Sequence, residues 1–173
     1  MKRGYIIENL FKIVIYITLF TFFSIIQLHS DSKTSKVSKI DKTDEVKKLL
    51  MREKILTISL SYLGTEYWPG GQSTEYGMDC SGFTQLVYKR AGINIPRTAY
   101  EQYFRSAKIS KSFLKKGDLV FFSTRWMGVN HVGIYIGDNK FIHSPSTGKC
   151  IKIDLLNSRY WGTRFISGGR YIY

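Results

Sequence analysis

Two neighbouring strand-like segments constrain the fold of this chain most. They lie within residues 130–144 and flank a turn at Gly137-Asp138-Asn139. Apolar side chains recur at every second position, as they do when alternate side chains point to opposite faces of a strand. The pattern predicts an antiparallel hairpin with His131 and His143 together on one face. That alignment requires an odd-length or bulged turn, because a simple two-residue turn at Asp138-Asn139 would shift the register by one residue.

A second informative feature is Cys80, which stands at the start of an amphipathic helix pattern. The apolar residues behind it recur at helical spacing; they are Phe83, Leu86, Val87 and Ala91. A helix N-terminus carries partial positive charge and unpaired N–H groups, which stabilise the nucleophilic thiolate form of cysteine. On the local sequence alone, a small apolar residue of a core helix explains Cys80 equally well.

The histidines help to decide between these interpretations. Of the three, His29 lies in the N-terminal segment, so only His131 and His143 belong to the folded part of the chain. A lone histidine on a strand is more often a hydrogen-bonded core residue than a catalyst. Two on one face, in a chain with a cysteine at a helix start, indicate a cysteine hydrolase. Such enzymes need a base beside the thiol and a third group that orients the base.

Eight short blocks of sequence extend this pattern along the chain. In order, they are YWPGG (67–71), DCSGF (79–83), IPRT (95–98), GDLVFF (117–122), HVGIYIG (131–137), FIH (141–143), YW (160–161) and RF (164–165). One block alone carries little weight, since GDLVFF is simply a strand preceded by a turn. Together, and in this order, they resemble the NlpC/P60 family of cysteine peptidases over roughly residues 46–173.

The resemblance implies an α+β, papain-like fold in which N-terminal helices pack on a central antiparallel sheet. It also implies a Cys-His-His triad and a role for each of six residues. By position these are the nucleophile Cys80, the base His131, the orienting residue His143, the oxyanion-binding Tyr67, and Asp79 and Ser81, which hold the free amine of a peptide substrate.

Better-known members of that family cut peptidoglycan stem peptides, typically between D-glutamate and the following diamino acid. We therefore expect a cell-wall cysteine endopeptidase that acts on this bond. Two alternatives remain open: an amidase, deamidase or acyltransferase on the same fold, or an inactive module that only binds peptide. The presence of all three triad residues argues against the inactive module.

Cofactors and disulfides are not expected. No Cys/His grouping has the spacing of zinc ligands, so the sequence predicts no metal and no cofactor. The second cysteine, Cys150, falls on a predicted third strand at residues 148–153. A disulfide between Cys80 and Cys150 would block the nucleophile, and we expect both thiols to remain free.

The N-terminal segment predicts export. Residues 1–30 have a positively charged start and an uncharged apolar run, Ile13–Ile26, which is 14 residues long. This length suits a signal peptide better than a full membrane span. Leu28 is too bulky for a good cleavage site, so an uncleaved membrane anchor is the alternative. Residues 31–44 form a predicted polar linker because they are rich in Ser, Lys, Thr and Asp and poor in large apolar side chains.

Residues 45–173 form the predicted catalytic domain. Its first helix should run to about residue 63, with four apolar side chains facing inward: Val46, Leu49, Leu50 and Ile58. Further along, Thr98 and Glu101 form a capping box for a short helix. Arg97 either ties down this turn, which we favour, or contacts substrate. The aromatic residues Trp68 and Trp126 either form walls of the substrate groove or pack on a neighbour.

Net charge bears on the partners. The formal net charge is +13, and excess positive charge favours encounters with anionic surfaces. No common nucleic-acid-binding motif is present. Combined with the leader, the charge points to the anionic cell wall or a membrane surface of the cell envelope. Peptidoglycan stem peptides are the partner that the family resemblance implies. We expect an exported monomer in the periplasm or cell envelope, tethered to the cytoplasmic membrane if the leader is retained.

Overall fold

The computed structural model describes residues 41–124, 128–146 and 150–173. Two compact units divide the chain, residues 1–46 and residues 47–173. Of the first unit only residues 41–46 are described, and they are helical. The predicted leader, residues 1–30, and most of the predicted linker lie outside the described residues. Within the described part of the chain, no helix is both long and apolar enough to cross a membrane.

Capping residues mark the ends of helices in the second unit. Helical backbone continues to residue 60, and three α-helices and one 3-10 helix follow: α2 (Cys80–Ala91), α3 (Ala99–Arg105), η1 (Lys111–Phe113) and α4 (Arg159–Gly162). Asp79 caps the N-terminus of α2, and Gly92 ends it in the left-handed conformation. Such residues satisfy the unpaired backbone groups at helix ends. The predicted capping box of α3 is confirmed, with Thr98 and Glu101 each bonding the backbone of the other.

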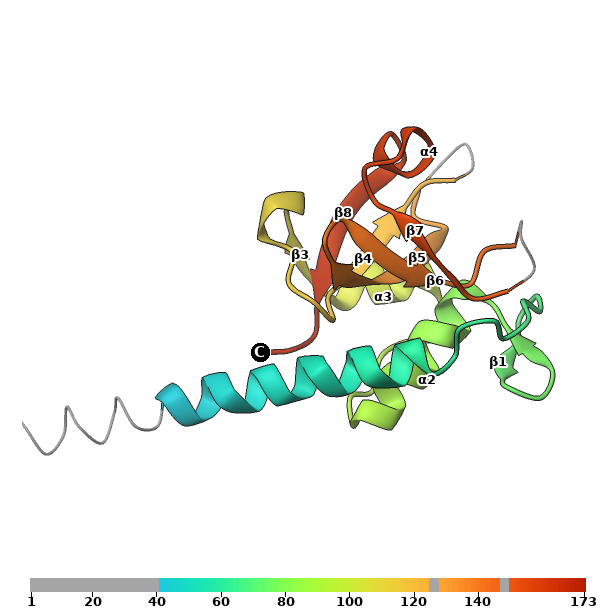
Figure 1. Cartoon of the computed structure of the whole chain (residues 1–173). Coiled ribbons are helices and arrows are strands. Elements are labelled where there is room, and N and C mark those ends of the chain that lie inside the picture. Colours follow the sequence, from blue (N-terminus) through green and yellow to red (C-terminus); the bar gives the residue numbers. More distant parts are fainter. Residues whose placement is uncertain (1–40, 125–127, 147–149) are drawn as a thin grey trace, which may run out of the picture. The chain divides into compact units, whose positions relative to one another are not determined.

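Two antiparallel sheets complete the second unit (Figure 1). The smaller pairs β1 (Gln72–Ser73) with β2 (Gly77–Met78). The larger has the strand order β3-β8-β4-β5-β6-β7, and all its neighbouring strands are antiparallel. Its strands are β3 (Ala107–Ile109), β4 (Leu119–Phe122), β5 (His131–Gly137), β6 (Lys140–His143), β7 (Lys152–Leu155) and β8 (Phe165–Arg170). The predicted α+β architecture, with helices packed on a central antiparallel sheet, is confirmed.

The larger sheet has an apolar cluster on each of its faces. On one, Phe83 and Val87 of α2 pack with sheet residues that include Val132, Ile134 and Ile142. The opposite face carries a mostly aromatic cluster: Val120, Phe122, Phe141, Leu156 and Trp161. Because alternate side chains of a strand point to opposite faces, β4, β5 and β6 each contribute to both clusters.

The inward face of the first helix differs from the prediction. Val46, Leu49 and Leu50 are 54%, 60% and 65% exposed, whereas Ile58 is partly buried against the core. The buried positions, at the 3-4 spacing of a helix, are Arg52, Ile55, Leu56, Ser59 and Tyr62. The prediction was wrong because a polar residue, Arg52, starts the buried stripe. Its Nη1 donates to the buried carboxylate of Asp118 at 2.9 Å.

The predicted third strand at residues 148–153 matches the structure only in part, and its residues 148–149 lie outside the described residues. Cys150 forms only an isolated antiparallel bridge with Glu66, and the continuous strand β7 starts at Lys152. Ile151 is buried in the core, whereas Ile153 is 37% exposed. Both cysteines are free, as expected.

Candidate active site

Cys80 is the first residue of α2, and its position follows from the loop before the helix. The Asp79 carboxylate accepts a hydrogen bond from the Gly82 N–H at 2.6 Å, which caps the helix. Position 82 must be glycine because the Gly71 backbone passes close to it: a Cβ there would lie 2.2 Å from the Gly71 carbonyl oxygen. Cap and glycine together hold the start of α2 against the loop at residue 71, which fixes the position of Cys80.

The electrostatic environment of Cys80 contains opposing effects. Burial raises the pKa of the thiol to about 11, and the Asp79 charge acts in the same direction. Hydrogen bonds from the backbone N–H groups of Val132, Ser81 and Cys80 itself lower this pKa. The Val132 contact shows that the start of β5 lies beside the sulfur. At rest the thiol is therefore neutral, and it needs a base to become a nucleophile.

The two histidines lie on one face of the sheet, as the sequence predicts. His131 Nε2 and His143 Nδ1 are 2.8 Å apart, within hydrogen-bond distance. Ile134 pairs with Ile142, so the apolar positions of β5 and β6 are aligned. Asp138 and Asn139 form the turn with positive φ angles, and the register shifts between Tyr135 and Gly137. The predicted bulge is therefore present.

Gly133 makes the close approach of the histidines sterically allowed. A Cβ at this position would lie 2.9 Å from the Ile142 carbonyl oxygen and 3.1 Å from the His143 Cβ. It would also lie 2.6 Å from an atom of the Phe141 ring. Any larger residue would push His143 away from His131.

Both imidazoles are buried and neutral. Burial, and to a smaller extent the neighbouring His143, lowers the pKa of His131 to about 3, although Asp154 opposes the shift. The pKa of His143 is also lowered, chiefly by burial, although the hydrogen bond to Asp154 opposes this shift. A neutral imidazole can accept a proton, which is the property that a general base needs.

A cleft of about 370 Å³ brings most of the predicted site residues together. Cys80 and His131 both line it, as do Tyr67, Asp79 and Ser81. His143 is fully buried and contacts His131. The other residues that line the cleft come from α3 and its cap and from the loops around β5 and β6, among them Thr98, Tyr100, Asn130 and Ser144. Trp68 is 59% exposed, and Trp126 lies outside the described residues.

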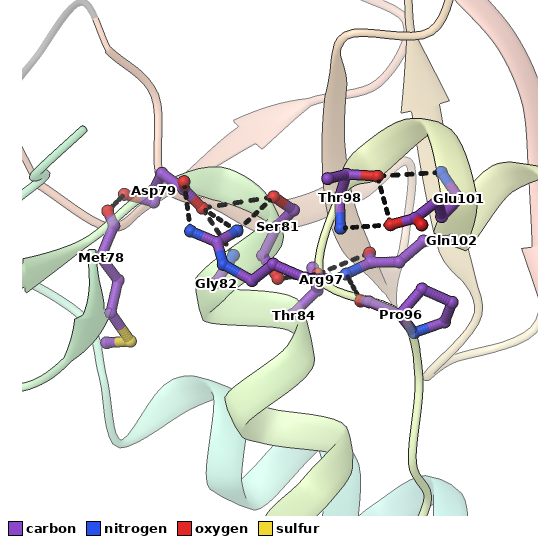
Figure 2. A network of polar contacts seen from close by, with 11 residues as sticks. Met78, Asp79, Ser81, Gly82, Thr84, Pro96, Arg97, Thr98, Glu101 and Gln102 are labelled. Carbon is purple, nitrogen blue, oxygen red and sulfur yellow. Dashed lines mark hydrogen bonds and ion pairs between the residues drawn. The ribbon is translucent and has the colours of Figure 1, made fainter. Parts of the chain in front are cut away.

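Asp79, Arg97 and Ser81 form a polar network beside the cleft (Figure 2). Two guanidinium nitrogens of Arg97 bond the two carboxylate oxygens of Asp79, at 3.0 and 2.7 Å. Arg97 also donates to the Ser81 hydroxyl at 2.9 Å. The favoured interpretation of Arg97, that it ties down the turn before α3, agrees with these contacts. The bidentate pair also fixes the carboxylate that faces the cleft.

Two further residues at the histidines carry no role in the sequence prediction. Asp154 Oδ2 lies 3.0 Å from His143 Nε2 and 2.9 Å from the Trp161 indole nitrogen. The Trp161 ring stacks on His131 with 22° between the planes and meets His143 edge-on. The alternation of residues 152–155 indicates that Lys152 and Asp154 share a face, but their approach to His143 depends on the pairing of β6 with β7.

The arrangement is suited to nucleophilic chemistry. A thiol at a helix start, a neutral imidazole in the same cleft and a second imidazole bonded to the first are the parts of an activated nucleophile. Among residues 41–124, 128–146 and 150–173, no group of three or more His, Cys, Asp or Glu side chains is placed to hold a metal ion.

Comparisons with known proteins identify relatives that are named endopeptidases. The chain is 44% identical over 115 residues to the murein DD-endopeptidase MepH of Escherichia coli (strain K12), covering 64% of this chain and 42% of that protein. It is 41% identical over 120 residues to the bifunctional muramidase/DL-endopeptidase CwlT of Bacillus subtilis (strain 168), covering 68% and 36%. It thus spans less than half the length of either relative.

A solved structure shows the same fold. It is the crystal structure of an NlpC/P60 family protein from Bacillus cereus ATCC 10987, with a TM-score of 0.67 and 35% sequence identity. The similarity covers 70% of this chain and 40% of that one. In addition, the model of the NlpC/P60 family matches residues 64–170, which include Cys80, both histidines and Asp154. The chain belongs to the NlpC/P60 family.

Proposed function

We propose that this protein is a cell-wall cysteine endopeptidase that hydrolyses an amide bond of peptidoglycan stem peptides, between D-glutamate and the diamino acid. The observation that carries the proposal is the shared cleft of Cys80 and His131, with His143 hydrogen-bonded to His131. The murein endopeptidase named among the relatives supports the substrate class.

Cys80, His131 and His143 act as the catalytic triad. His131 takes the thiol proton as the sulfur attacks the carbonyl carbon, forming a C–S bond and an oxyanion. Protonated His131 then gives the proton to the leaving amine, the C–N bond breaks, and a thioester remains. Water, deprotonated by His131, hydrolyses the thioester, and the proton returns to the sulfur of Cys80.

The oxyanion is stabilised by the backbone N–H of Cys80 and by the hydroxyl of Tyr67. Each such donor contributes roughly 3 kcal/mol to transition-state stabilisation in comparable sites. Tyr67 lines the same cleft as Cys80, which supports this role.

Asp79 and Ser81 hold the free amine of the stem peptide. Both line the cleft, and the contacts with Arg97 orient their oxygens. Because the guanidinium already neutralises Asp79, the amine is recognised by oriented oxygen acceptors more than by net negative charge.

Residues 1–30 act as a signal peptide or membrane anchor, residues 31–44 as a linker, and residues 45–173 as the catalytic domain. Export places the domain on the outer side of the cytoplasmic membrane, where peptidoglycan lies. N-terminal sequencing of the protein from cell fractions tests this. A full-length chain found only in the cytosol would contradict export.

Digestion of purified peptidoglycan, with mass spectrometry of the released fragments, tests the activity and the bond. Cleavage after D-glutamate leaves glycan-linked stems that have lost the diamino acid. Cleavage of cross-links instead, as the name of the DD-endopeptidase relative indicates, yields uncross-linked stems that keep it.

Two cysteine variants make the test specific. C80A should abolish release while keeping the thermal unfolding temperature, because the other triad residues and the core remain. C150A should keep most activity, because Cys150 is absent from the residues that line the cleft among those described. Equal release by C80A and by the parent protein would exclude the proposed nucleophile.

A further inference from the structure

His131, His143 and Asp154 form a row of three hydrogen-bonded side chains, with His143 in the middle. Strand β7 pairs with β6 so that Lys152 lies opposite His143 and Asp154 opposite Phe141. Asp154 is therefore the diagonal neighbour of His143 on the same sheet face. Its Oδ2 lies 3.0 Å from His143 Nε2, on the far side of that ring from the nitrogen that contacts His131.

The contacts determine which ring nitrogens carry protons. An ionised carboxylate only accepts hydrogen bonds, so His143 Nε2 must carry the proton that points to Asp154. In a neutral ring the other nitrogen, Nδ1, is then bare and accepts from His131 Nε2–H. His131 Nδ1 is consequently bare too, and this is the nitrogen left to accept a proton.

We propose that Asp154 is a positioning residue that fixes both histidines in the Nε2–H tautomer and stabilises the imidazolium formed when His131 takes the Cys80 proton. The inference rests on the proposed cysteine chemistry. Without Asp154 both histidines can instead adopt the Nδ1–H tautomer. Nδ1–H of His143 then donates to a bare His131 Nε2, and His131 Nδ1 keeps a proton and accepts none.

The surroundings keep Asp154 charged and in place. The Trp161 indole N–H and the Lys152 ammonium donate to the same oxygen, at 2.9 and 3.1 Å. Hydrogen bonds from His143, Trp161 and Lys152 hold the pKa of Asp154 well below its usual range. Trp161 also stacks on His131, so this one side chain contacts both Asp154 and His131 and holds them in place.

The charged groups that face the two histidines have opposite effects. From β7, Asp154 favours a protonated ring and Lys152 disfavours it. From α2, the Cys80 thiolate forms only as the proton leaves. The Lys152 side chain is 42% exposed, against 24% for Asp154 and 0% for His143. Solvent therefore screens Lys152 more, and its effect should be the smaller of the two.

The test measures Cys80 reactivity, which requires no peptidoglycan. The full chain carrying C150S has Cys80 as its only thiol, and iodoacetamide alkylation is followed from pH 5 to pH 9. D154N should alkylate about tenfold more slowly at pH 6, because less thiolate forms when the imidazolium loses its carboxylate. K152Q should shift the rate the opposite way, by a smaller factor. D138N removes an equal charge from the turn between β5 and β6 and should leave the profile unchanged.

Ring-nitrogen NMR of ¹⁵N-histidine protein supplies a second readout that lost packing alone would not produce. The parent should show the Nε2–H tautomer at both His131 and His143, and D154N should show mixed tautomers. Unchanged alkylation and tautomers in a folded D154N would overturn the proposal, as would an equal slowing by D138N. If D154N fails to fold, the parent protein decides: the Nε2–H tautomer at both His131 and His143 supports the proposal, and any other pair of tautomers overturns it. Failure to digest peptidoglycan would contradict the proposed function and leave these measurements intact.

Discussion

At the scale of single residues, burial sets the resting state of the site. It raises the pKa of the Cys80 thiol and lowers that of His131, so both groups are neutral at neutral pH. The Val132 N–H and the N-terminus of α2 favour the thiolate, and Asp154 favours the imidazolium. In the proposed mechanism, proton transfer from Cys80 to His131 therefore creates two charges, each of which already has groups beside it that stabilise it.

The depressed pKa of His131 makes stability depend on pH. The unfolded chain takes up a proton near pH 6.5, whereas folded His131 does so only near pH 3. The unfolded state thus binds more protons between these values, and the free energy of unfolding falls as the pH falls. For His131 alone the loss is about 2 kcal/mol between pH 7 and pH 5.

Urea unfolding of the parent and of H131Q at both pH values tests this. The variant should be less stable at pH 7, because it loses the stack on Trp161, but its stability should fall less between pH 7 and pH 5. Equal losses in the two proteins would show that His131 is protonated in the folded state.

At the scale of elements, the β5–β6 hairpin positions the two imidazoles. A two-residue turn alone would place the apolar side chains of the two strands on opposite faces, and the bulge between Tyr135 and Gly137 restores the alignment. Gly133 then leaves the space that allows His143 to approach His131. The hairpin therefore combines a register requirement with a steric one.

Substitution of Gly133 should damage both activity and stability. In G133A the new methyl group meets the Ile142 carbonyl and the His143 Cβ, which cannot move without shifting β6. Overpacking of this kind lowers the free energy of unfolding by about 1–3 kcal/mol, and peptidoglycan hydrolysis should fall at least tenfold. The control is G162A in α4, where the nearest atoms lie at 3.5 Å. A G133A enzyme as active as G162A would show that the spacing of the histidines is uncritical.

At the scale of the whole domain, Asp118 connects three parts of the second unit. Its fully buried carboxylate binds Arg52 of the first helix at 2.9 Å and Arg170 of β8 at 2.6 Å. Asp118 itself directly precedes β4. The Arg52 side chain is only 10% exposed. Both the positive charge of Arg52 and the negative charge of Asp118 are therefore buried. Such a network holds the helix and two strands in register but depends on every partner.

Loss of Asp118 should destabilise the domain strongly. D118A leaves the Arg52 guanidinium buried without its carboxylate, which typically lowers the free energy of unfolding by about 3–5 kcal/mol. Unfolding in guanidinium chloride measures the stability of D118A against that of E53Q. The E53Q control removes an exposed carboxylate from the helix that carries Arg52 and should change the free energy of unfolding by no more than about 0.5 kcal/mol. A D118A protein as stable as E53Q would show that the network contributes little.

The patterns that predicted the site were local or repeated at short range. Asp79 before Cys80 predicts a helix start, and Thr98 with Glu101 predicts a cap, because both depend only on neighbouring backbone groups. The alternation around His131 and His143 is equally local. Their shared face could therefore be predicted from the sequence, together with the condition that a bulge be present.

Other features were decided only when separate elements met. Asp154 reaches His143 through the pairing of β6 with β7, and that register is set by the whole sheet. Leu49 and Leu50 look like core residues, but the buried stripe instead begins at Arg52, because Asp118, 66 residues away, supplies its partner. The sequence by itself determined the helix caps, the strand faces and the residue types proposed for catalysis, since these follow from the chemistry of near neighbours. The tertiary structure decided which distant side chains complete the site and the core, since such contacts depend on how the elements pack.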